Sequence, residues 1–240
     1  MNVFSCRSLL LCLIFVLAGC DNSGSSKKQN LIMNGKTMGT VWRVSVADVP
    51  ASRRDQLQKL IQQQLDHDDQ ELSTWKPDSA LSRFNQYQGS EPWPVSEAMA
   101  DIVTMALRIG AKTAGAMDIT VGPLVNLWGF GPTKAPQHTP TQAQIDQAKA
   151  LTGLQHLKVI QTFKGQALQK DLPGLYVDLS TMGEGYATDH LARLMESQGI
   201  TNYLVSVGGA LLSRGHNAQG NSWRVAIEKP TDLENVAQAV

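Results

Sequence analysis

The sequence has few cysteines and no cluster of positive charge. Its 240 residues include three cysteines, Cys6, Cys12 and Cys20, all within the first twenty positions. The rest of the chain therefore offers no thiol for a disulfide, a zinc site or a cysteine nucleophile. Lysine plus arginine and aspartate plus glutamate both number 21, and no basic run would neutralise several phosphates in a row. The composition therefore argues against a nucleic-acid partner.

The first twenty residues have the pattern of an export signal. Arg7 supplies the positive charge, residues 9–17 are apolar, and small residues follow. The apolar stretch is too short to span a bilayer. Leu17-Ala18-Gly19-Cys20 resembles the lipobox of bacterial lipoproteins, which implies cleavage before Cys20 and acylation (palmitate) of that cysteine. The alternative is an ordinary secretory signal with a chance cysteine.

The stretch after Cys20 is polar and rich in serine and glycine. Residues 21–30 therefore predict a flexible tether, whose mean reach is roughly 17 Å for ten residues. An aspartate after the acylated cysteine resembles an inner-membrane retention signal, and Asp21 has that position. We expect a signal peptide over 1–19, a lipidated cysteine and tether over 20–32, and a globular domain over 33–240. This domain would be anchored by lipid at the periplasmic side of the inner membrane.

Helical and strand patterns are mixed without a regular alternation, which predicts the α+β class. With 42% hydrophobic residues the chain can bury a core of ordinary size. Capping residues and apolar spacing predict helices that start near Ser52, Ser96 and Thr231 and at about Gly183, and the helix from Ser96 should end before Gly115. Asp78 or Ser79 would cap a further short helix. Thr141 and Gln144 predict a capping box at the start of another helix. Alternating apolar residues and glycine turns predict strands around 40–46, 156–161, 175–179, 203–207, 211–214 and 223–227.

The segment from Gly115 to Gly131 contains four glycines, one proline, two large aromatics and the single carboxylate of Asp118. Such a composition is hard to pack as a regular helix or strand. Its glycines would let the backbone approach a ligand closely, and Trp128 and Phe130 would offer flat apolar faces to a ring system. The alternative is a loop that covers the core with both aromatics buried.

Residues 177–186 run through two hydroxyl residues and two glycines into a helix. Unpaired backbone N–H groups and the helix dipole make such a start attractive to phosphate. Ser180 or Thr181 would be able to ligate magnesium, as hydroxyls do in other phosphate loops. The pattern is neither a Walker loop nor a dinucleotide fingerprint. A plain N-cap and turn built on serine or threonine is the competing interpretation.

Three further features each have a purely structural and a functional interpretation. Trp75, on a proline-containing loop before a short helix, either stacks on a ligand or covers the surface. The five histidines follow no metal-ligand spacing, and we expect His190 to face solvent rather than to act as a base. The acidic run over 66–71 is interpreted as a solvated face, because the glycine of a calcium loop is missing.

Five blocks, in this order along residues 33–229, resemble the ApbE family: Thr37-Met38-Gly39-Thr40, 73–85, 117–131, 178–189 and 205–209. The resemblance implies an FAD:protein FMN transferase with an ApbE-like mixed sheet and packed helices. In that reaction Mg²⁺ holds the FAD pyrophosphate, a threonine hydroxyl of an acceptor protein attacks the FMN phosphorus, and AMP leaves. The implied acceptors are periplasm-exposed subunits of redox complexes.

Residue by residue, the resemblance implies that FAD contacts Met38, Trp75, Ala116, Met117, Asp118, Asp178 and Glu184, and that Mg²⁺ contacts Thr181. Trp75 would flank the isoalloxazine, and the turn over 178–185 would face the pyrophosphate and the metal. Many members of the family have lysine where this chain has Glu184. A carboxylate there would repel phosphate, so Glu184 would have to face the ribose, the adenine or the metal.

The family continues past residue 240 with an Asp…Thr segment that supplies further magnesium ligands and with a histidine-containing segment near the reaction centre. We therefore expect the catalytic residues beyond residue 240 and a fold that is incomplete at its C-terminus. Residues 1–240 alone would bind FAD weakly and transfer FMN poorly, since magnesium usually needs one or two carboxylates besides phosphates. The alternatives are a flavin-binding lipoprotein without catalysis and an FAD pyrophosphatase.

Overall fold

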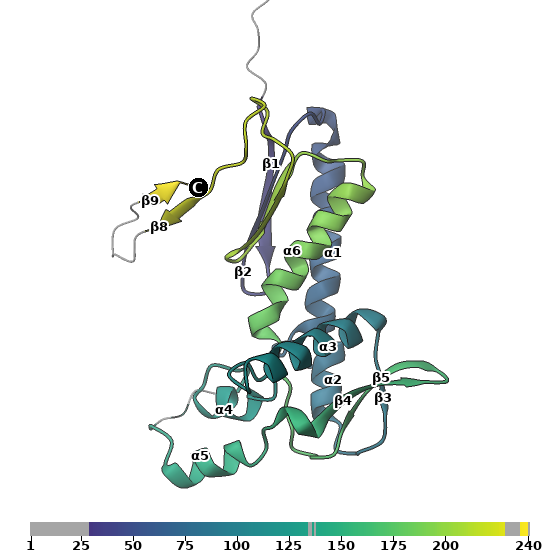
Figure 1. The fold of residues 1–240 in the computed structure, drawn as a ribbon, viewed down its shortest axis with the longest axis vertical. Coiled ribbons are helices and arrows are strands. Elements are labelled where there is room, and N and C mark those ends of the chain that lie inside the picture. The colour runs from purple at the N-terminus through teal and green to yellow at the C-terminus, as the bar shows by residue number, and fades with distance from the viewer. Residues whose placement is uncertain (1–28, 134–135, 137, 229–235, 240) are drawn as a thin grey trace, which may run out of the picture.

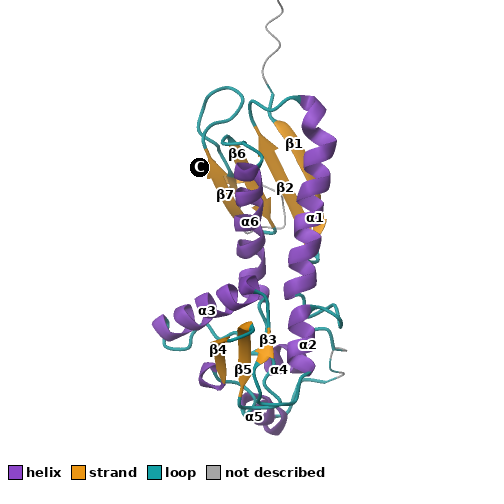
Figure 2. Ribbon diagram, turned by 90° about the vertical axis from the view of Figure 1, so that its right-hand side faces the viewer, coloured by secondary structure: helices purple, strands orange, loops and turns teal. Residues whose placement is uncertain are grey.

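A computed structural model describes residues 29–133, 136, 138–228 and 236–239 (Figure 1). The expected signal peptide, Cys20 and the helix start at Thr231 lie outside these residues. The described part consists of helices and mostly antiparallel strands, which confirms the α+β class. It has an upper half with one larger sheet and two long helices, and a lower half with a small sheet and short helices (Figures 1 and 2). None of its helices combines the length and apolarity that crossing a bilayer requires.

The upper half is a four-stranded antiparallel sheet with two helices on one face (Figure 2). Its strand order is β1-β2-β6-β7. The strands are β1 (Leu31–Thr37), β2 (Thr40–Val46), β6 (Tyr203–Val207) and β7 (Ala210–Arg214). The helices are α1 (Arg54–Leu72), preceded by the 3-10 turn η1 (Ala51–Arg53), and α6 (Ser180–Ser197). Strand β6, which follows α6 in sequence, pairs with β2. The sheet therefore combines strands from the beginning and from the later part of the chain.

The upper core is the contact between the inner sheet face and these helices. Leu57, Ile61 and Leu65 follow one another at intervals of four residues along α1 and are fully buried, as the apolar stripe predicts. Each such side chain contributes roughly 1.5–3 kcal/mol by leaving water. Trp42 of β2 lies against Gly35 of β1, where an added Cβ would come within 2.6 Å of the indole ring. Glycine at position 35 therefore makes room for the tryptophan.

The lower half packs short helices around a three-stranded sheet with the order β3-β5-β4. The helices are α2 (Ala80–Gln86), α3 (Glu97–Lys112), α4 (Gly122–Leu127) and α5 (Gln142–Lys149), with the 3-10 turn η2 (Leu154–His156). The strands are β3 (Trp93–Pro94), β4 (Leu157–Thr162) and β5 (Gly165–Lys170). A second core forms between α2, α3 and this sheet and includes Phe84, Met99, Val103 and Leu168. Strands β8 (Ala226–Glu228) and β9 (Val236–Ala239) form a hairpin that projects from the body (Figure 1).

The caps predicted from sequence are confirmed at three helices. Ser79 accepts a hydrogen bond from the Ser82 N–H, and Ser96 accepts one from the Met99 N–H. Thr141 and Gln144 form the full capping box at α5. These motifs involve only residues three apart, so local sequence is sufficient to specify them.

Other predictions differ from the structure in a cap, a boundary or the type of element. The helix predicted near Ser52 is present as α1, but Ser52 lies inside η1 and does not cap it, because α1 begins at Arg54. Residues 175–179 form one isolated bridge, between Tyr176 and Val121, rather than a strand. The predicted strand over 223–227 is reduced to β8, and α6 begins at Ser180 rather than near Gly183.

Glycine and proline content also misled the prediction over 115–131. The segment contains α4, which has Pro123 in its first turn, where a proline needs no backbone donor. Strands β1 and β5 were not predicted from sequence either. In β1 the alternation is weakened by Asn34 and Gly35, and the strand directly follows the polar tether.

Candidate active site

A cavity of about 470 Å³ lies beside the end of α1 and the start of α6, a volume that suits a small-molecule ligand. These two helix ends lie where the upper and lower halves meet (Figure 2). Three stretches far apart in sequence line the cavity: the β1–β2 turn, the end of α1 with the following loop over 73–76, and the start of α6. The lining includes Met38, Trp75 and Glu184, three of the residues for which the family resemblance implies an FAD contact. The fold therefore brings these three residues together.

Met38 is held in an uncommon backbone conformation at the rim of this cavity. It forms a two-residue turn with Gly39 between the paired residues Thr37 and Thr40, and the φ angles of Met38 and Gly39 are 47° and 74°. Positive φ at both positions is the geometry of a type I′ hairpin turn. A methionine pays steric strain there that glycine or asparagine would avoid, and such strain is often found at ligand sites.

Trp75 is 64% exposed at the mouth of the cavity. Its loop is nevertheless fixed: the Trp75 N–H donates to Ser73 Oγ, and the hydroxyls of Ser79 and Ser82 donate to the Ser73 carbonyl. Lys76 Nζ lies 2.6 Å from Asp69 Oδ2 at the end of α1. An exposed indole on a fixed loop can stack on a planar ring with little loss of conformational entropy.

The start of α6 forms the floor of the cavity. Its N-cap residue is Leu179, which has no side chain able to cap. The Ser180 N–H donates to Asp178 Oδ1 at 2.8 Å, whereas the Thr181 side chain is exposed on the same turn. The interpretation of Ser180 or Thr181 as a plain N-cap is therefore wrong. The positive end of the helix dipole points toward the cavity and attracts anions.

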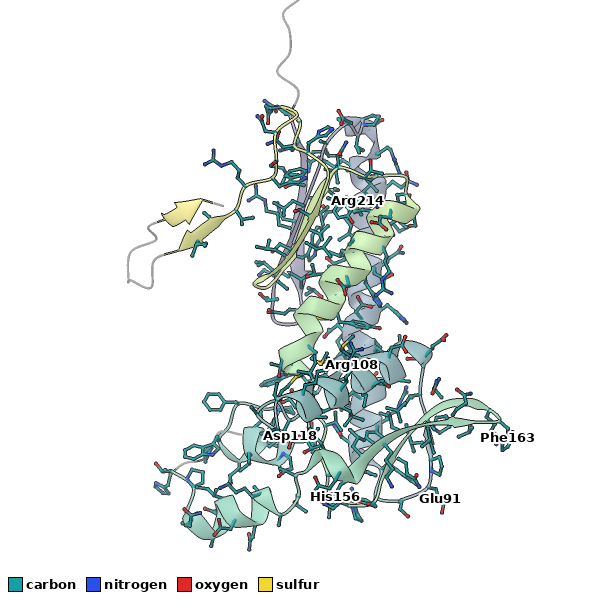
Figure 3. All side chains as sticks on the ribbon, in the orientation of Figure 1. Glu91, Arg108, Asp118, His156, Phe163 and Arg214 are labelled. Carbon is teal, nitrogen blue, oxygen red and sulfur yellow. The ribbon has the colours of Figure 1, made fainter. Side chains whose placement is uncertain are left out.

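The segments over 115–131 and 177–186 lie side by side, as the FAD contacts implied by the resemblance for Asp118 and Asp178 require. The Asp178 N–H donates to the Ile119 carbonyl at 2.8 Å, and Val121 bridges Tyr176 in parallel. The carboxylate of Asp118, which lies in the lower half of the molecule (Figure 3), accepts from the backbone N–H and the hydroxyl of Thr120 at 2.7 and 2.6 Å. This arrangement fixes the position of Asp118 relative to Asp178.

Not every predicted contact lines the cavity. Ala116, Met117, Asp118, Asp178 and Thr181 are absent from the described lining, although Ser180 and Leu179 next to the last two belong to it. Their contacts with FAD and magnesium stay predictions.

Trp128 and Phe130, at the end of α4, also lie outside the cavity lining within the described residues. Their exposed fractions are 43% and 78%. The alternative in which both aromatics are buried under a loop is therefore wrong.

A buried polar network supports the segment that carries Asp178, and sequence analysis did not identify it. The Asn85 side chain donates to the Val177 carbonyl and accepts from the Val177 N–H, both at 2.8 Å. Lys170 is 1% exposed and donates to the carbonyls of Asn85 and Leu175 at 3.3 and 3.2 Å. Burial lowers the pKa of Lys170 to about 8. The side-chain amide of Asn85 thus takes the place of a neighbouring strand.

A second polar network joins α1 to α6 just behind the cavity. His190 Nδ1 lies 2.8 Å from Asp68 Oδ1, which also accepts from Gln64 Nε2. The Tyr186 ring lies 4.1 Å from the imidazole, and burial, followed by the charge of Asp68, raises the pKa of Tyr186 to about 12. The His190 side chain is 16% exposed, so the expectation that it faces solvent is wrong. For Asp68, which is 1% exposed, the expectation of a solvated acidic face is wrong as well. Helix packing, which spacing alone does not reveal, buries both residues.

The described residues contain no group of three or more His, Cys, Asp and Glu side chains that would hold a metal ion. Thr181 offers one hydroxyl oxygen, which is the kind of donor that magnesium prefers.

Comparison with known proteins gives a consistent result. The family model described as "ApbE family" matches residues 38–240. The FAD:protein FMN transferase of Salmonella typhimurium is 65% identical over 243 residues, an alignment that covers 100% of this chain and 69% of that protein. The FAD:protein FMN transferase of Escherichia coli is 62% identical over 244 residues, with 100% and 70% covered.

Solved structures agree with this result. The flavin transferase ApbE from Vibrio cholerae superposes with a TM-score of 0.80 at 41% identity and covers 88% of this chain and 68% of that one. The ApbE protein from Thermotoga maritima has a TM-score of 0.75 at 22% identity, and that likeness concerns the fold alone.

Proposed function

The chain belongs to the ApbE family, and from this membership together with the cavity we propose that it is an FAD:protein FMN transferase. It is a transferase that uses FAD as its substrate and a second protein as the flavin acceptor. The observation that carries this function is the meeting of Met38, Trp75, the start of α6 and Glu184 around one cavity. A cavity with an exposed aromatic at its mouth and a helix N-terminus at its floor suits a ligand that has both a ring system and a diphosphate.

The proposed reaction transfers a phosphoryl-linked flavin to a threonine. The hydroxyl oxygen of the acceptor threonine forms a bond to the FMN phosphorus, and the bond from this phosphorus to the bridging oxygen breaks. AMP leaves with the bridging oxygen, and the hydroxyl proton is released. Such chemistry depends mainly on positioning and on neutralising the charge of the phosphates.

The orientation of FAD follows from the chemistry of the cavity walls. The isoalloxazine would lie against the indole of Trp75, and the diphosphate would face the N-terminal end of α6, where the helix dipole favours negative charge. Glu184 carries a negative charge and would face donors such as ribose hydroxyls rather than phosphate. Asp118 and Asp178, each fixed by backbone hydrogen bonds, would take further FAD donors.

Magnesium would be held by the Thr181 hydroxyl together with oxygens of the FAD phosphates. When bound, the ion neutralises charge on the diphosphate. Thr181→Val, which keeps the shape but removes the hydroxyl, should raise the Mg²⁺ concentration needed for half-maximal FAD binding, whereas Thr181→Ser should not. Equal Mg²⁺ dependence in both variants would remove Thr181 from the metal site.

The activity is tested by incubating the full-length protein with FAD, Mg²⁺ and an acceptor peptide that contains threonine. We expect mass spectrometry to find FMN covalently attached to the peptide and chromatography to find an equal amount of AMP. AMP with free FMN and no adduct would indicate an FAD pyrophosphatase instead. Bound FAD without any AMP would indicate a flavin-binding protein without catalysis.

The anchoring of the protein is a separate part of the proposal. The lipobox ending at Cys20 supports a lipid-modified protein at the periplasmic side of the inner membrane, where its acceptors would be exposed subunits of redox complexes. Cell fractionation should find the wild-type protein in the membrane and Cys20→Ser in the soluble periplasmic fraction. The same distribution for both would contradict the anchor.

A further inference from the structure

The turn between β6 and β7 is part of a block that resembles the family, but nothing above assigns it a task. It consists of Gly208 and Gly209, between the paired residues Val207 and Ala210. The Gly208 φ angle is 59°, and its N–H donates to the Val41 carbonyl of β2 at 3.0 Å. The turn is therefore fixed to the sheet.

The same turn holds the carboxylate of Glu184. The Gly209 N–H donates to Glu184 Oε2 at 3.3 Å. A Cβ added at Gly208 would overlap the Glu184 carboxylate, whereas a Cβ added at Gly209 would meet no described atom within 4 Å. Glycine at 208 thus provides the space that the carboxylate occupies, and the backbone at 209 provides its donor.

The position of Glu184 on α6 explains why it matters that the β6–β7 turn fixes the Glu184 carboxylate. Glu184 lies near the start of α6, and helical side chains lean toward the N-terminus of their helix. A mobile carboxylate would be attracted to the N-terminal end of α6, because the helix dipole favours negative charge there. It would then compete with the phosphates of a ligand for the same end of the helix.

We infer that the Gly208–Gly209 turn is a positioning element that keeps the Glu184 carboxylate beside the β6–β7 turn. There its oxygens can accept from hydroxyl or amine donors of FAD, and the Glu184 carboxylate does not compete with the diphosphate for the N-terminal end of α6. This inference rests on the proposed function, since it presupposes that FAD binds in the cavity.

Alanine substitutions in the full-length protein test the inference. Gly208→Ala should raise the KM for FAD about tenfold, the effect of losing one hydrogen bond to a charged group, with kcat changed less than KM. Gly209→Ala retains the N–H and should cause a smaller rise. Gly199→Ala controls for backbone strain, because Gly199 has a φ of 71°, has open space around it and lies at the far end of α6. It should leave the KM unchanged.

A double-substitution cycle shows whether the turn acts through Glu184. In a Glu184→Ala background the space for a Cβ at position 208 is free, so adding Gly208→Ala should change the KM for FAD and the melting temperature much less than in the wild type. Glu184→Asp, whose shorter side chain reaches Gly209 less well, should raise the KM in the same direction as Gly208→Ala. The Glu184 variants keep the inference testable if Gly208→Ala fails to fold.

The outcomes distinguish a failure of the proposed function from a failure of this inference alone. A wild-type protein that binds no FAD would overturn the proposed function and this inference with it. A wild-type protein that binds FAD, with equal KM values for Gly208→Ala and Gly199→Ala, would overturn the inference alone. An undiminished effect of Gly208→Ala in the Glu184→Ala background would also overturn it.

Discussion

Lys170 should make the stability of the protein depend on pH in an unusual direction. The Lys170 residue is 1% exposed, and burial lowers its pKa from the ordinary 10.5 to about 8. Because the folded-state pKa is the lower one, the unfolded chain binds more protons between pH 8 and 10.5. The free energy of unfolding therefore increases with pH across this window, and the destabilisation is fully present below pH 8. A difference of about 2.5 pH units corresponds to roughly 3 kcal/mol at most.

The assay is urea unfolding of the wild type and Lys170→Met at pH 8, 9 and 10. Methionine has a similar length but no charge, so the variant should lose this upward slope. The difference in the free energy of unfolding between wild type and Lys170→Met at neutral pH is less informative. In the variant the carbonyls of Asn85 and Leu175 lose their donor, at a cost of about 1–3 kcal/mol each. Tyr186, whose pKa is raised to about 12, destabilises the fold only above pH 10 and does so in both proteins.

Lys158→Met is the matched control, because Lys158 is an exposed lysine on the neighbouring strand β4. It should keep the slope of the wild type. The reasoning would be refuted if Lys170→Met kept that slope too, since the Lys170 ammonium would then not be desolvated in the folded protein.

Three further predictions follow from contacts described above. Gly35→Ala should destabilise the fold by about 1–3 kcal/mol through overpacking against Trp42, and an unchanged melting temperature would contradict this. Trp75→Ala should weaken FAD binding about tenfold through lost stacking while leaving urea unfolding nearly unchanged, because the indole is 64% exposed; equal affinity in a fluorescence titration would exclude the stacking. Asp68→Ala should lower the free energy of unfolding by about 2–4 kcal/mol by removing the buried partner of His190, and a loss below 1 kcal/mol would mean that the pair contributes little.

What could be predicted from sequence depended on how far apart the interacting residues lie. The caps at Ser79, Ser96 and Thr141 and the stripe of α1 follow from residues within two helical turns, and all were predicted correctly. The apolar residues over 175–179 are typical of a strand, but the segment forms only one isolated bridge. Its main-chain partners include the side chain of Asn85, 92 residues away from Val177, and no local pattern encodes that contact.

In the candidate site, too, local features could be predicted from sequence and long-range contacts could not. The blocks that contain Met38, Trp75 and Glu184 could be singled out one by one, and the fold places these residues around one cavity. The pairing of Asp68 with His190 joins two helices 122 residues apart in sequence, so the burial of these residues could not be predicted. The positive φ at Met38 becomes visible only once the register of β1 and β2 is known.

The cavity has one consequence for the order of events when the protein is made. Its walls come from the β1–β2 turn, the end of α1 with the loop over 73–76, and the start of α6, so they assemble only when segments far apart in sequence have come together. Closing such long loops is slow compared with forming helices or hairpins. Flavin binding should therefore appear late in refolding, after most of the helical signal has returned, and no short fragment should retain it. Newly made chains would consequently be unable to consume FAD before they are folded.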